Sequence, residues 1–270
     1  MSVAVPRLVS HLFERLPDEL QQRFLSVSKT VNSGPASVKL KIKFLESLRR
    51  DVDGLRLPRG ASPWANYYRK ADENYFRTDL SPGDWQRKQE AIRRILTEVR
   101  PKTVLDVGAN TGYYAKMAAG SGARVTACET DVSALTCCYE DARKEKKNIL
   151  PLAVNVFSVS PTPGRGGVPC PAPRDRLRSD FVMGLAVIHH VVANQRLPIV
   201  RISEMFADLS SRWLLLEYTP PLKHKIGASP VPSLDDYRVD DLESCLKQRF
   251  HSVSRLPSYP HERKLFLCEK

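Results

Sequence analysis

Short apolar runs alternate along the chain with segments in which apolar residues recur at helical spacing. Runs that end in polar residues predict strands over 103–107, 124–129, 149–156 and 213–218. Residues 180–190 predict a fourth strand that runs into its loop at His189 and His190. Apolar residues three and four positions apart predict the intervening helices, such as one over 199–209 and one that starts at Ser81, ends before Pro101 and is expected to be structural. The stretch over 158–178, rich in Pro and Gly, is expected to be a surface loop. Strands that alternate with helices are typical of a mostly parallel α/β sheet.

The first 80 residues have a different pattern. Two amphipathic helices are expected, one opened by Pro17 and one following Ser37, with a break at 32–35 between them. A loop rich in Gly and Pro over 51–63 follows the second helix. We therefore expect an N-terminal helical extension or lid over 1–80 and an α/β domain over 81–270.

The length and charge of the chain limit the classes of function that need to be considered. A chain of 270 residues has room for one α/β domain plus an extension. The formal net charge of +12 favours polyanions, so RNA and acidic metabolites are considered as partners. No compact block of Lys and Arg is present, and this favours charges scattered over solvated helix faces, with nucleic acid as the weaker alternative.

The six cysteines form no C-x-x-C pair and have no metal-ligand spacing with histidine. We expect reduced thiols and no bound metal. No signal peptide and no apolar span of 18 residues is present, which predicts a cytoplasmic protein without membrane association. The sequence does not specify an oligomeric state.

The strand over 103–107 leads into a turn that contains Asp106, Gly108, Asn110 and Gly112. Glycine adopts positive φ at little cost and has no Cβ, so a ligand can approach the backbone of such a turn. Ligands of open α/β sheets bind at the carboxyl ends of strands. These four residues are therefore candidates for cofactor binding.

A second acid strengthens this interpretation. Glu129 follows the next strand, about twenty residues past the turn, where βαβ nucleotide binders place an acid against ribose hydroxyls. The pairing resembles class I S-adenosylmethionine (SAM) methyltransferases over residues 100–270. That resemblance implies SAM as cofactor, with its aminoacyl group over the glycine turn and its ribose on Glu129. It makes Asp131 the cap of the next helix and a second candidate for the ribose.

The same resemblance implies a Rossmann-like sheet of seven strands, mostly parallel, with an antiparallel last strand in a hairpin over 250–253 and 265–268. It also places Asn155 near the adenine amine, where many relatives have Asp. The pair His189–His190 resembles the I-H-H of a small-molecule branch of nodulation-type methyltransferases. Imidazole with a near-neutral pKa suits proton removal from a hydroxyl or amine, and we expect one of the two histidines to be structural.

An aromatic cluster beside a cation follows the loop at 51–63: Trp64, Tyr67, Tyr68 and Arg69. In one interpretation Trp64 and Tyr67 pack the N-terminal helices onto the main domain. In the other the cluster is a lid, in which tyrosine rings face the sulfonium and Arg69 faces a carboxylate. The lid interpretation makes Tyr67 and Arg69 cofactor contacts and Tyr68 a third catalytic candidate beside the histidines.

Together these features predict a SAM-dependent methyltransferase that acts on a hydroxyl or amine of a small, natural-product-like molecule. Two alternatives stay open. A SAM-consuming cyclase would form azetidine-2-carboxylic acid and methylthioadenosine from SAM alone. An RNA methyltransferase or RNA-binding module would account for the positive charge.

Overall fold

The computed structural model describes residues 22, 43, 46–50, 62, 64–65, 87–158, 173–220, 237–258 and 262–270. Contacts divide the chain into two units, Met1–Leu57 and Pro58–Lys270. In the first unit, residues 46–50 are helical, within the second helix expected there. Most of the expected extension over 1–80 lies outside the described residues and stays a prediction.

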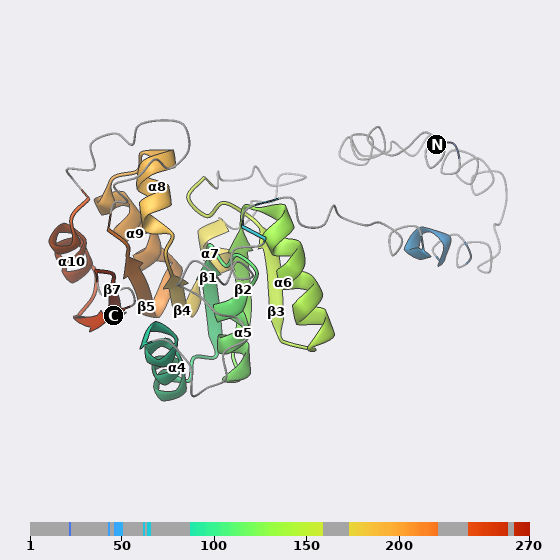
Figure 1. Ribbon diagram of the computed structural model, residues 1–270, viewed down its shortest axis with the longest axis horizontal. Helices are drawn as coiled ribbons and strands as arrows, with labels where there is room; N and C mark the ends of the chain where they lie inside the picture. Colours follow the sequence, from blue (N-terminus) through green and yellow to red (C-terminus); the bar gives the residue numbers. More distant parts are fainter. Residues whose placement is uncertain are drawn as a thin grey trace, which may run out of the picture. The chain divides into compact units, whose positions relative to one another are not determined.

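The second unit is built on one mixed sheet. Among the described residues its strand order is β3-β2-β1-β4-β5-β7-β6 (Figure 1). Neighbours from β3 to β5 are parallel, and β7 is antiparallel to both β5 and β6. The order reverses between β1 and β4, and this switch point is where open α/β sheets bind ligands. The strands are β1 Thr103–Val107, β2 Arg124–Glu129, β3 Ile149–Ala153, β4 Ser179–Gly184, β5 Ser210–Tyr218, β6 Ser252–Pro257 and β7 Lys264–Glu269.

Helices cover both faces of this sheet, and each face has its own hydrophobic core. On one face Val104 packs in a cluster with Ile92 and Ala115, from α4 and α5. On the other face Leu105 packs with Val191 and Ile202, from α8 and α9. Successive strand residues thus supply opposite cores, as the two-residue period of a strand requires. The helices are α4 Arg87–Val99, α5 Tyr113–Gly120, α6 Val132–Lys144, α7 Pro173–Leu177, α8 Ile188–Gln195, α9 Ile199–Leu209 and α10 Val239–Lys247.

The fold predicted from sequence is confirmed: a mostly parallel Rossmann-like sheet with an antiparallel last strand. The predicted helix over 199–209 is α9 as observed, and the closing hairpin is β6 and β7. The strands predicted over 103–107 and 124–129 match β1 and β2.

Three predicted segments differ. The fourth strand ends at Gly184, and the histidine pair lies in the first turn of α8 rather than in a loop after the strand. Ala186 causes this change because its φ of 53° turns the chain away from the strand direction. The third strand stops at Ala153, and the predicted surface loop over 158–178 contains the short helix α7.

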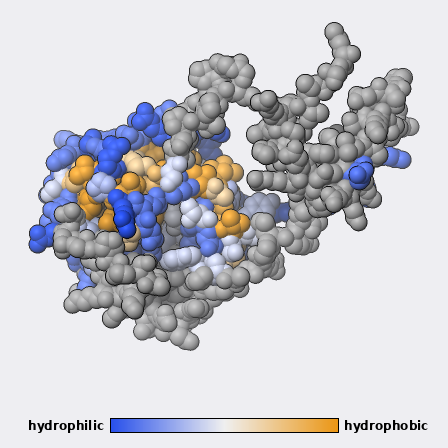
Figure 2. Space-filling model, turned by 90° about the horizontal axis from the view of Figure 1, so that it is seen from above, coloured by the Kyte–Doolittle hydropathy of each residue, from blue (hydrophilic) through white to orange (hydrophobic). Residues whose placement is uncertain are grey.

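The surface of the described residues contains both hydrophobic and hydrophilic side chains. On the face seen in Figure 2, a group of hydrophobic residues is bordered by hydrophilic ones. Within the part of the chain that the structure describes, no helix is long and apolar enough to span a bilayer.

Candidate functional site

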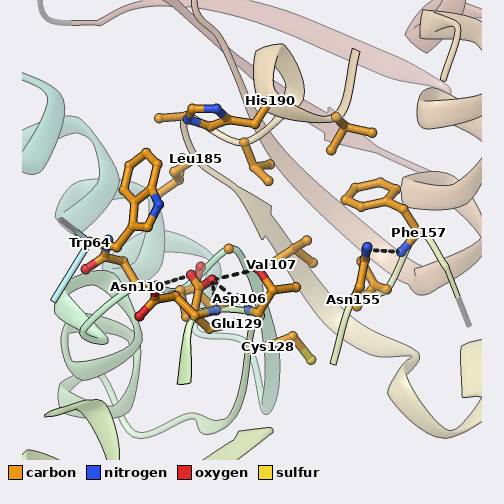
Figure 3. Close-up of a pocket in the computed structure, with 18 of the residues that line it drawn as sticks. Trp64, Asp106, Val107, Asn110, Cys128, Glu129, Asn155, Phe157, Leu185 and His190 are labelled. Atoms are coloured by element: carbon orange, nitrogen blue, oxygen red, sulfur yellow. Dashed lines mark hydrogen bonds between the residues drawn. The ribbon is translucent and has the colours of Figure 1, made fainter. Parts of the chain in front are cut away.

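A cavity of about 540 Å³ opens at the carboxyl ends of β1, β2 and β4. This volume lies in the range of small-molecule and cofactor sites. Figure 3 shows Asp106 and Glu129 close together at its base, with Asn155 and Phe157 at one side. Most of the residues predicted from sequence line it, namely Asp106, Gly108, Asn110, Glu129, Asp131, Asn155, His189 and His190.

The glycine turn is fixed to the neighbouring strand by its backbone. The N–H groups of Gly108 and Ala109 both donate to the Cys128 carbonyl, at 2.9 and 3.1 Å. Gly108 has a φ of 75°, and a Cβ there would lie 3.1 Å from Cγ2 of Val187. Gly108 is therefore required by its backbone conformation and by the close approach of the loop after β4.

Gly112 has a different role from the one expected. Its φ is 81° and it is the N-cap of α5, but it does not line the cavity. A Cβ at this position would overlap Sγ of Cys138 on α6. The glycine allows α5 and α6 to pack closely, and only Gly108 of the pair faces the cavity.

Glu129 holds the loops after β1 and β2 together. Its Oε2 accepts from the N–H of Asn110 at 2.8 Å. Its Oε1 accepts from the N–H groups of Thr130 at 2.6 Å and Asp131 at 2.9 Å. A carboxylate oxygen accepts more than one hydrogen bond, so Oε2 retains capacity for a ligand hydroxyl.

Asp131 is the helix cap that the sequence predicts. Its Oδ1 accepts from the N–H of Ala134 at 2.8 Å at the start of α6. The same oxygen accepts from the hydroxyl of Ser62 at 2.9 Å. Ser62 Oγ in turn accepts from the N–H groups of Trp64 and Ala65, at 3.2 and 3.1 Å. This chain of bonds holds Trp64 at the cavity.

Trp64 and His190 form an aromatic contact on one side of the cavity (Figure 3). Their ring centroids are 5.2 Å apart and the planes are nearly perpendicular. The ring of His189 lies 4.0 Å from that of His190. Of the predicted aromatic cluster, the structure thus places Trp64 at the cavity, whereas Tyr67, Tyr68 and Arg69 lie outside the described residues.

His189 is buried, and burial lowers its pKa to about 3, with smaller contributions from nearby cations and from His190. Its Nδ1 has no hydrogen-bond partner within the described part of the chain. The pKa of His190 is also lowered by burial, with Glu129 acting in the opposite direction. Both imidazoles are neutral at physiological pH, and His189 is a far weaker base than the near-neutral group expected from sequence.

Asp106, which lies beside Glu129 at the base of the cavity, has a raised pKa, whereas the pKa values of the two histidines are lowered. Burial and the neighbouring Glu129 raise the pKa of Asp106 to about 7, although the Ala115 N–H and Lys88 act to lower it. The carboxyl group of Asp106 therefore changes its charge near neutral pH. A cationic ligand group beside it would favour the ionised form.

A buried ion pair forms a further wall of the site and was not predicted. Lys88 Nζ lies 2.6 Å from Glu217 Oε2, and both side chains are almost completely buried. Lys88 and Arg263 line the cavity, Lys88 from α4 and Arg263 from the residue before β7. The sequence indicates only a structural role for α4, whereas Lys88 of this helix lines the cavity. A signal existed, because Lys88 lies four residues before Ile92 on the apolar stripe of the helix.

Asn155 is held by its own loop. Its Oδ1 accepts from the N–H of Phe157 at 3.0 Å, and its Nδ2 donates to Ser158 Oγ at 3.0 Å. A longer contact of 3.4 Å joins Nδ2 to Oε1 of Gln195, which also lines the cavity. Gln195 was missed because α8 was not predicted.

This strand order, with an antiparallel β7 between β5 and β6, matches the Rossmann-like methyltransferase fold. No family model matches the sequence. The chain is similar to nodulation protein NoeA of Rhizobium meliloti strain 1021, with 24% identity over 274 residues. The alignment covers 98% of this chain and 55% of NoeA, so the chain spans about half the length of that relative.

Two solved structures are also similar. The magnesium protoporphyrin IX methyltransferase ChlM of Synechocystis PCC 6803, with bound SAM, is 14% identical, with a TM-score of 0.46 over 67% of this chain and 77% of ChlM. The bifunctional kinase-methyltransferase WbdD is 16% identical, with a TM-score of 0.48 over 67% of this chain and 39% of WbdD.

Proposed function

We propose that the protein binds SAM in this cavity and transfers its methyl group to a hydroxyl or amine of a small-molecule acceptor. The observation that carries the proposal is the arrangement of two acids around one glycine turn. Asp106 and Glu129 lie at the ends of adjacent parallel strands, and both line the cavity with Gly108 between them. This arrangement suits a ligand with an ammonium group at one end and ribose hydroxyls next to it.

The residues present fit SAM in size and chemistry. Asp106, with a pKa of about 7, would ionise beside the ammonium group of the aminoacyl portion. Oε2 of Glu129 would accept from a ribose hydroxyl. At the far side, Phe157 and the amide groups of Asn155 and Gln195 offer an apolar surface and hydrogen bonds to adenine.

SAM supplies a methyl group that is already electrophilic, so the protein's contribution is mainly to position the reactants and exclude water. Trp64 and His190 lie where they would cover the reacting groups. His189 and His190 are neutral and can accept a hydrogen bond from an acceptor hydroxyl or amine. This orients the nucleophile. As the methyl group moves from the sulfur of SAM to the oxygen or nitrogen of the acceptor, S-adenosylhomocysteine is left, and the proton of the acceptor passes to the hydrogen-bonded imidazole and from it to solvent.

Incubation of the purified protein with SAM alone, followed by liquid chromatography–mass spectrometry, tests the proposal. SAM that survives, with S-adenosylhomocysteine formed only when an acceptor is added, is the expected result. Methylthioadenosine with azetidine-2-carboxylic acid would show that the protein cyclises SAM instead of transferring its methyl group. Absence of SAM binding by calorimetry would overturn the proposed cofactor as well.

The positive charge gives weaker support to an RNA substrate. Several arginines on the described surface are paired with acids, for example Arg249 with Glu204 and Arg212 with Glu269. Such pairs reduce the field available to a phosphate backbone. RNA affinity that falls steeply with salt concentration would favour the RNA alternative over a small-molecule acceptor.

A further inference from the structure

Exposed cations gather at the amino ends of three adjacent strands. The strands β1, β2 and β3 are parallel neighbours, so the segments that lead into them share one edge of the sheet, opposite the cavity (Figure 1). The N–H of Arg124 donates to the Lys102 carbonyl, and the N–H of Val125 donates to the Asn148 carbonyl, each at 3.0 Å. The cations of this edge, here called the basic edge, are Arg100, Lys102, Arg124, Arg143, Lys144, Lys146 and Lys147.

Few acids balance the charge of the basic edge. Asp141 and Glu145, at the end of α6, both pair with Lys116 of α5, at 2.8 and 3.7 Å. Oδ2 of Asp180 accepts from two backbone N–H groups at the start of β1, each at 3.1 Å. Within the described part of the chain, no carboxylate lies within ion-pair distance of a basic-edge cation. All of these cations are exposed except Lys147, which is half-buried.

Local structure accounts for only part of this charge. Two of the cations lie in the last turn of α6, where positive charge stabilises the helix dipole. Arg100 and Lys146 follow α4 and α6 with φ of 46° and 51°, in the left-handed conformation that glycine usually adopts after a helix. Lys102 and Arg124 lead into strands, where no helix dipole attracts them. A binding role for the edge accounts for cations at all of these positions.

An exposed aromatic side chain lies next to the basic edge. Tyr139 is 51% exposed and lies four residues before Arg143, on the same face of α6. Of the other large apolar side chains exposed on the described residues, only Leu150 lies near this edge. Membrane-binding surfaces insert several apolar side chains beside their cations, whereas surfaces for single-stranded nucleic acid combine cations with an aromatic ring on which a base stacks. The basic edge and Tyr139 have the second combination.

We propose that the basic edge and Tyr139 bind single-stranded nucleic acid through its phosphates and one stacked base. The starts of the three strands form a row with a spacing of about 4.8 Å, and a row of cations suits a linear chain of phosphates. Since β1 has 5 residues, this row lies about 17 Å from the cavity. The bound strand is therefore a partner rather than the methyl acceptor, and the inference does not depend on the proposed function.

Fluorescence anisotropy of a labelled oligouridylate of about 12 nucleotides tests the proposal on the full chain. The logarithm of the affinity should fall with the logarithm of the salt concentration, by about 0.7 for each phosphate contact. The double variant Lys102→Gln with Arg124→Gln loses two contacts, so the slope should decrease by about 1.4 and the affinity should fall roughly 10- to 30-fold at about 0.1 M salt. Tyr139→Ala should weaken binding about 5- to 100-fold without changing the slope, and Tyr139→Phe should retain the affinity.

A matched double variant controls for net charge. Lys247→Gln with Arg255→Gln removes two surface cations, from α10 and β6, that both pair with Glu243. This control should leave the slope and the affinity unchanged. An equal loss in the control would mean that binding follows net charge alone, and the proposal would be wrong. Thermal unfolding of both double variants checks that they are folded.

The remaining outcomes separate this site from other sites and partners. Competition by S-adenosylhomocysteine, or methylation of the oligonucleotide by SAM, would place the nucleic acid at the cavity and overturn the assignment. Binding to vesicles of phosphatidylcholine and phosphatidylserine but not to the oligonucleotide, lost in Lys102→Gln with Arg124→Gln, would assign the basic edge to a membrane surface instead. Protein that binds SAM but neither oligonucleotide nor vesicles would contradict the inference and leave the proposed function intact.

Discussion

The hydroxyl of Ser62 donates to Oδ1 of Asp131 across 69 residues of sequence, at 2.9 Å. The same oxygen caps α6, which begins directly after the loop that carries Glu129. One carboxylate thus fixes a helix start and the segment that positions Trp64. This hydrogen bond thus links the segment of Trp64 to the start of α6.

Removing that hydroxyl tests the dependence. Ser62→Ala leaves the cap of α6 intact, because Asp131 still accepts from Ala134. The loss of one hydrogen bond corresponds to about 1 kcal/mol, so SAM affinity should fall about fivefold with little change in stability. Calorimetry and thermal unfolding measure the two effects. A fall in stability without a change in affinity would contradict the role assigned to Ser62.

Replacement of the Trp64 indole tests whether this ring attracts the sulfonium of SAM by a cation–π interaction or only covers the cavity. If the indole of Trp64 faces the sulfonium, Trp64→Ala weakens SAM binding by about 0.5–2 kcal/mol and affects the neutral S-adenosylhomocysteine less. Trp64→Phe keeps an aromatic face and should restore part of the difference. Equal losses for the two ligands would mean that the ring only covers the cavity.

Asp106 and His189, two buried titratable groups of the cavity, should give stability opposite dependences on pH. Asp106 has a pKa of about 7, above the value of 3.8 for an exposed acid. As pH rises, the carboxyl group of Asp106 therefore stays protonated in the folded state after it has ionised in the unfolded state. The contribution of this carboxyl group to the free energy of unfolding is lost as pH rises from about 4 through 7. Relative to Asp106→Asn, the wild type should lose several kcal/mol over this window in urea titrations.

His189 acts in the other direction. Its pKa of about 3 lies below the usual 6.5, so the unfolded state gains a proton first as pH falls. The wild type should lose stability from about pH 6.5 down towards pH 3, and His189→Gln should not show this loss. A stability difference between the wild type and His189→Gln that does not change with pH would show that the imidazole is not buried in solution.

The two glycines of the turn should separate stability from binding. Gly112→Ala places a methyl group against Cys138 and keeps a left-handed φ, so stability should fall by about 2–4 kcal/mol. Protein that remains folded should bind SAM normally, because Gly112 does not line the cavity. Gly108→Ala should weaken binding as well, since its methyl group forces Val187 to move at the cavity wall. Denaturation and calorimetry on both variants measure the two effects.

Removing only the acid of the Lys88–Glu217 ion pair should destabilise the protein more than removing both charges. Glu217→Gln leaves Lys88 buried without its main counter-charge, and we expect a loss of about 3–5 kcal/mol in the free energy of unfolding. The double variant Lys88→Met with Glu217→Gln should lose less than Glu217→Gln alone. A larger loss in the double variant would mean that Lys88 stabilises the fold through its stem rather than through its charge.

Local features of the fold could be predicted from sequence. The turn after β1, the cap at Asp131 and the helix α9 each depend on residues close together in the chain, whose types specify the conformation directly. The helix α8 was missed because Val191 and Val192 prolong an apolar, β-branched pattern. Only the left-handed conformation of Ala186 separates that pattern from the strand.

The buried ion pair of Lys88 and Glu217 could not be predicted, because the two residues are distant in sequence. Lys88 and Glu217 are 129 positions apart, and nothing near Lys88 indicates which acid it will meet. The position of Lys88 on an apolar stripe shows only that the helix would bury a charge. Its partner is set by packing of α4 against the end of β5, which follows from the whole sheet.

The segments that line the cavity also differ in when they can come together during synthesis. The pairings among β1, β2 and β3 join residues that are close together in the chain, and all three strands are synthesised well before β7. Arg263 comes into place only when β7 inserts between β5 and β6. A nascent chain that ends before residue 263 can shape the cofactor half of the cavity, but it has Lys88 and Glu217 without the second cation. This wall of the cavity is therefore completed last during synthesis, after the strands that end at Asp106 and Glu129.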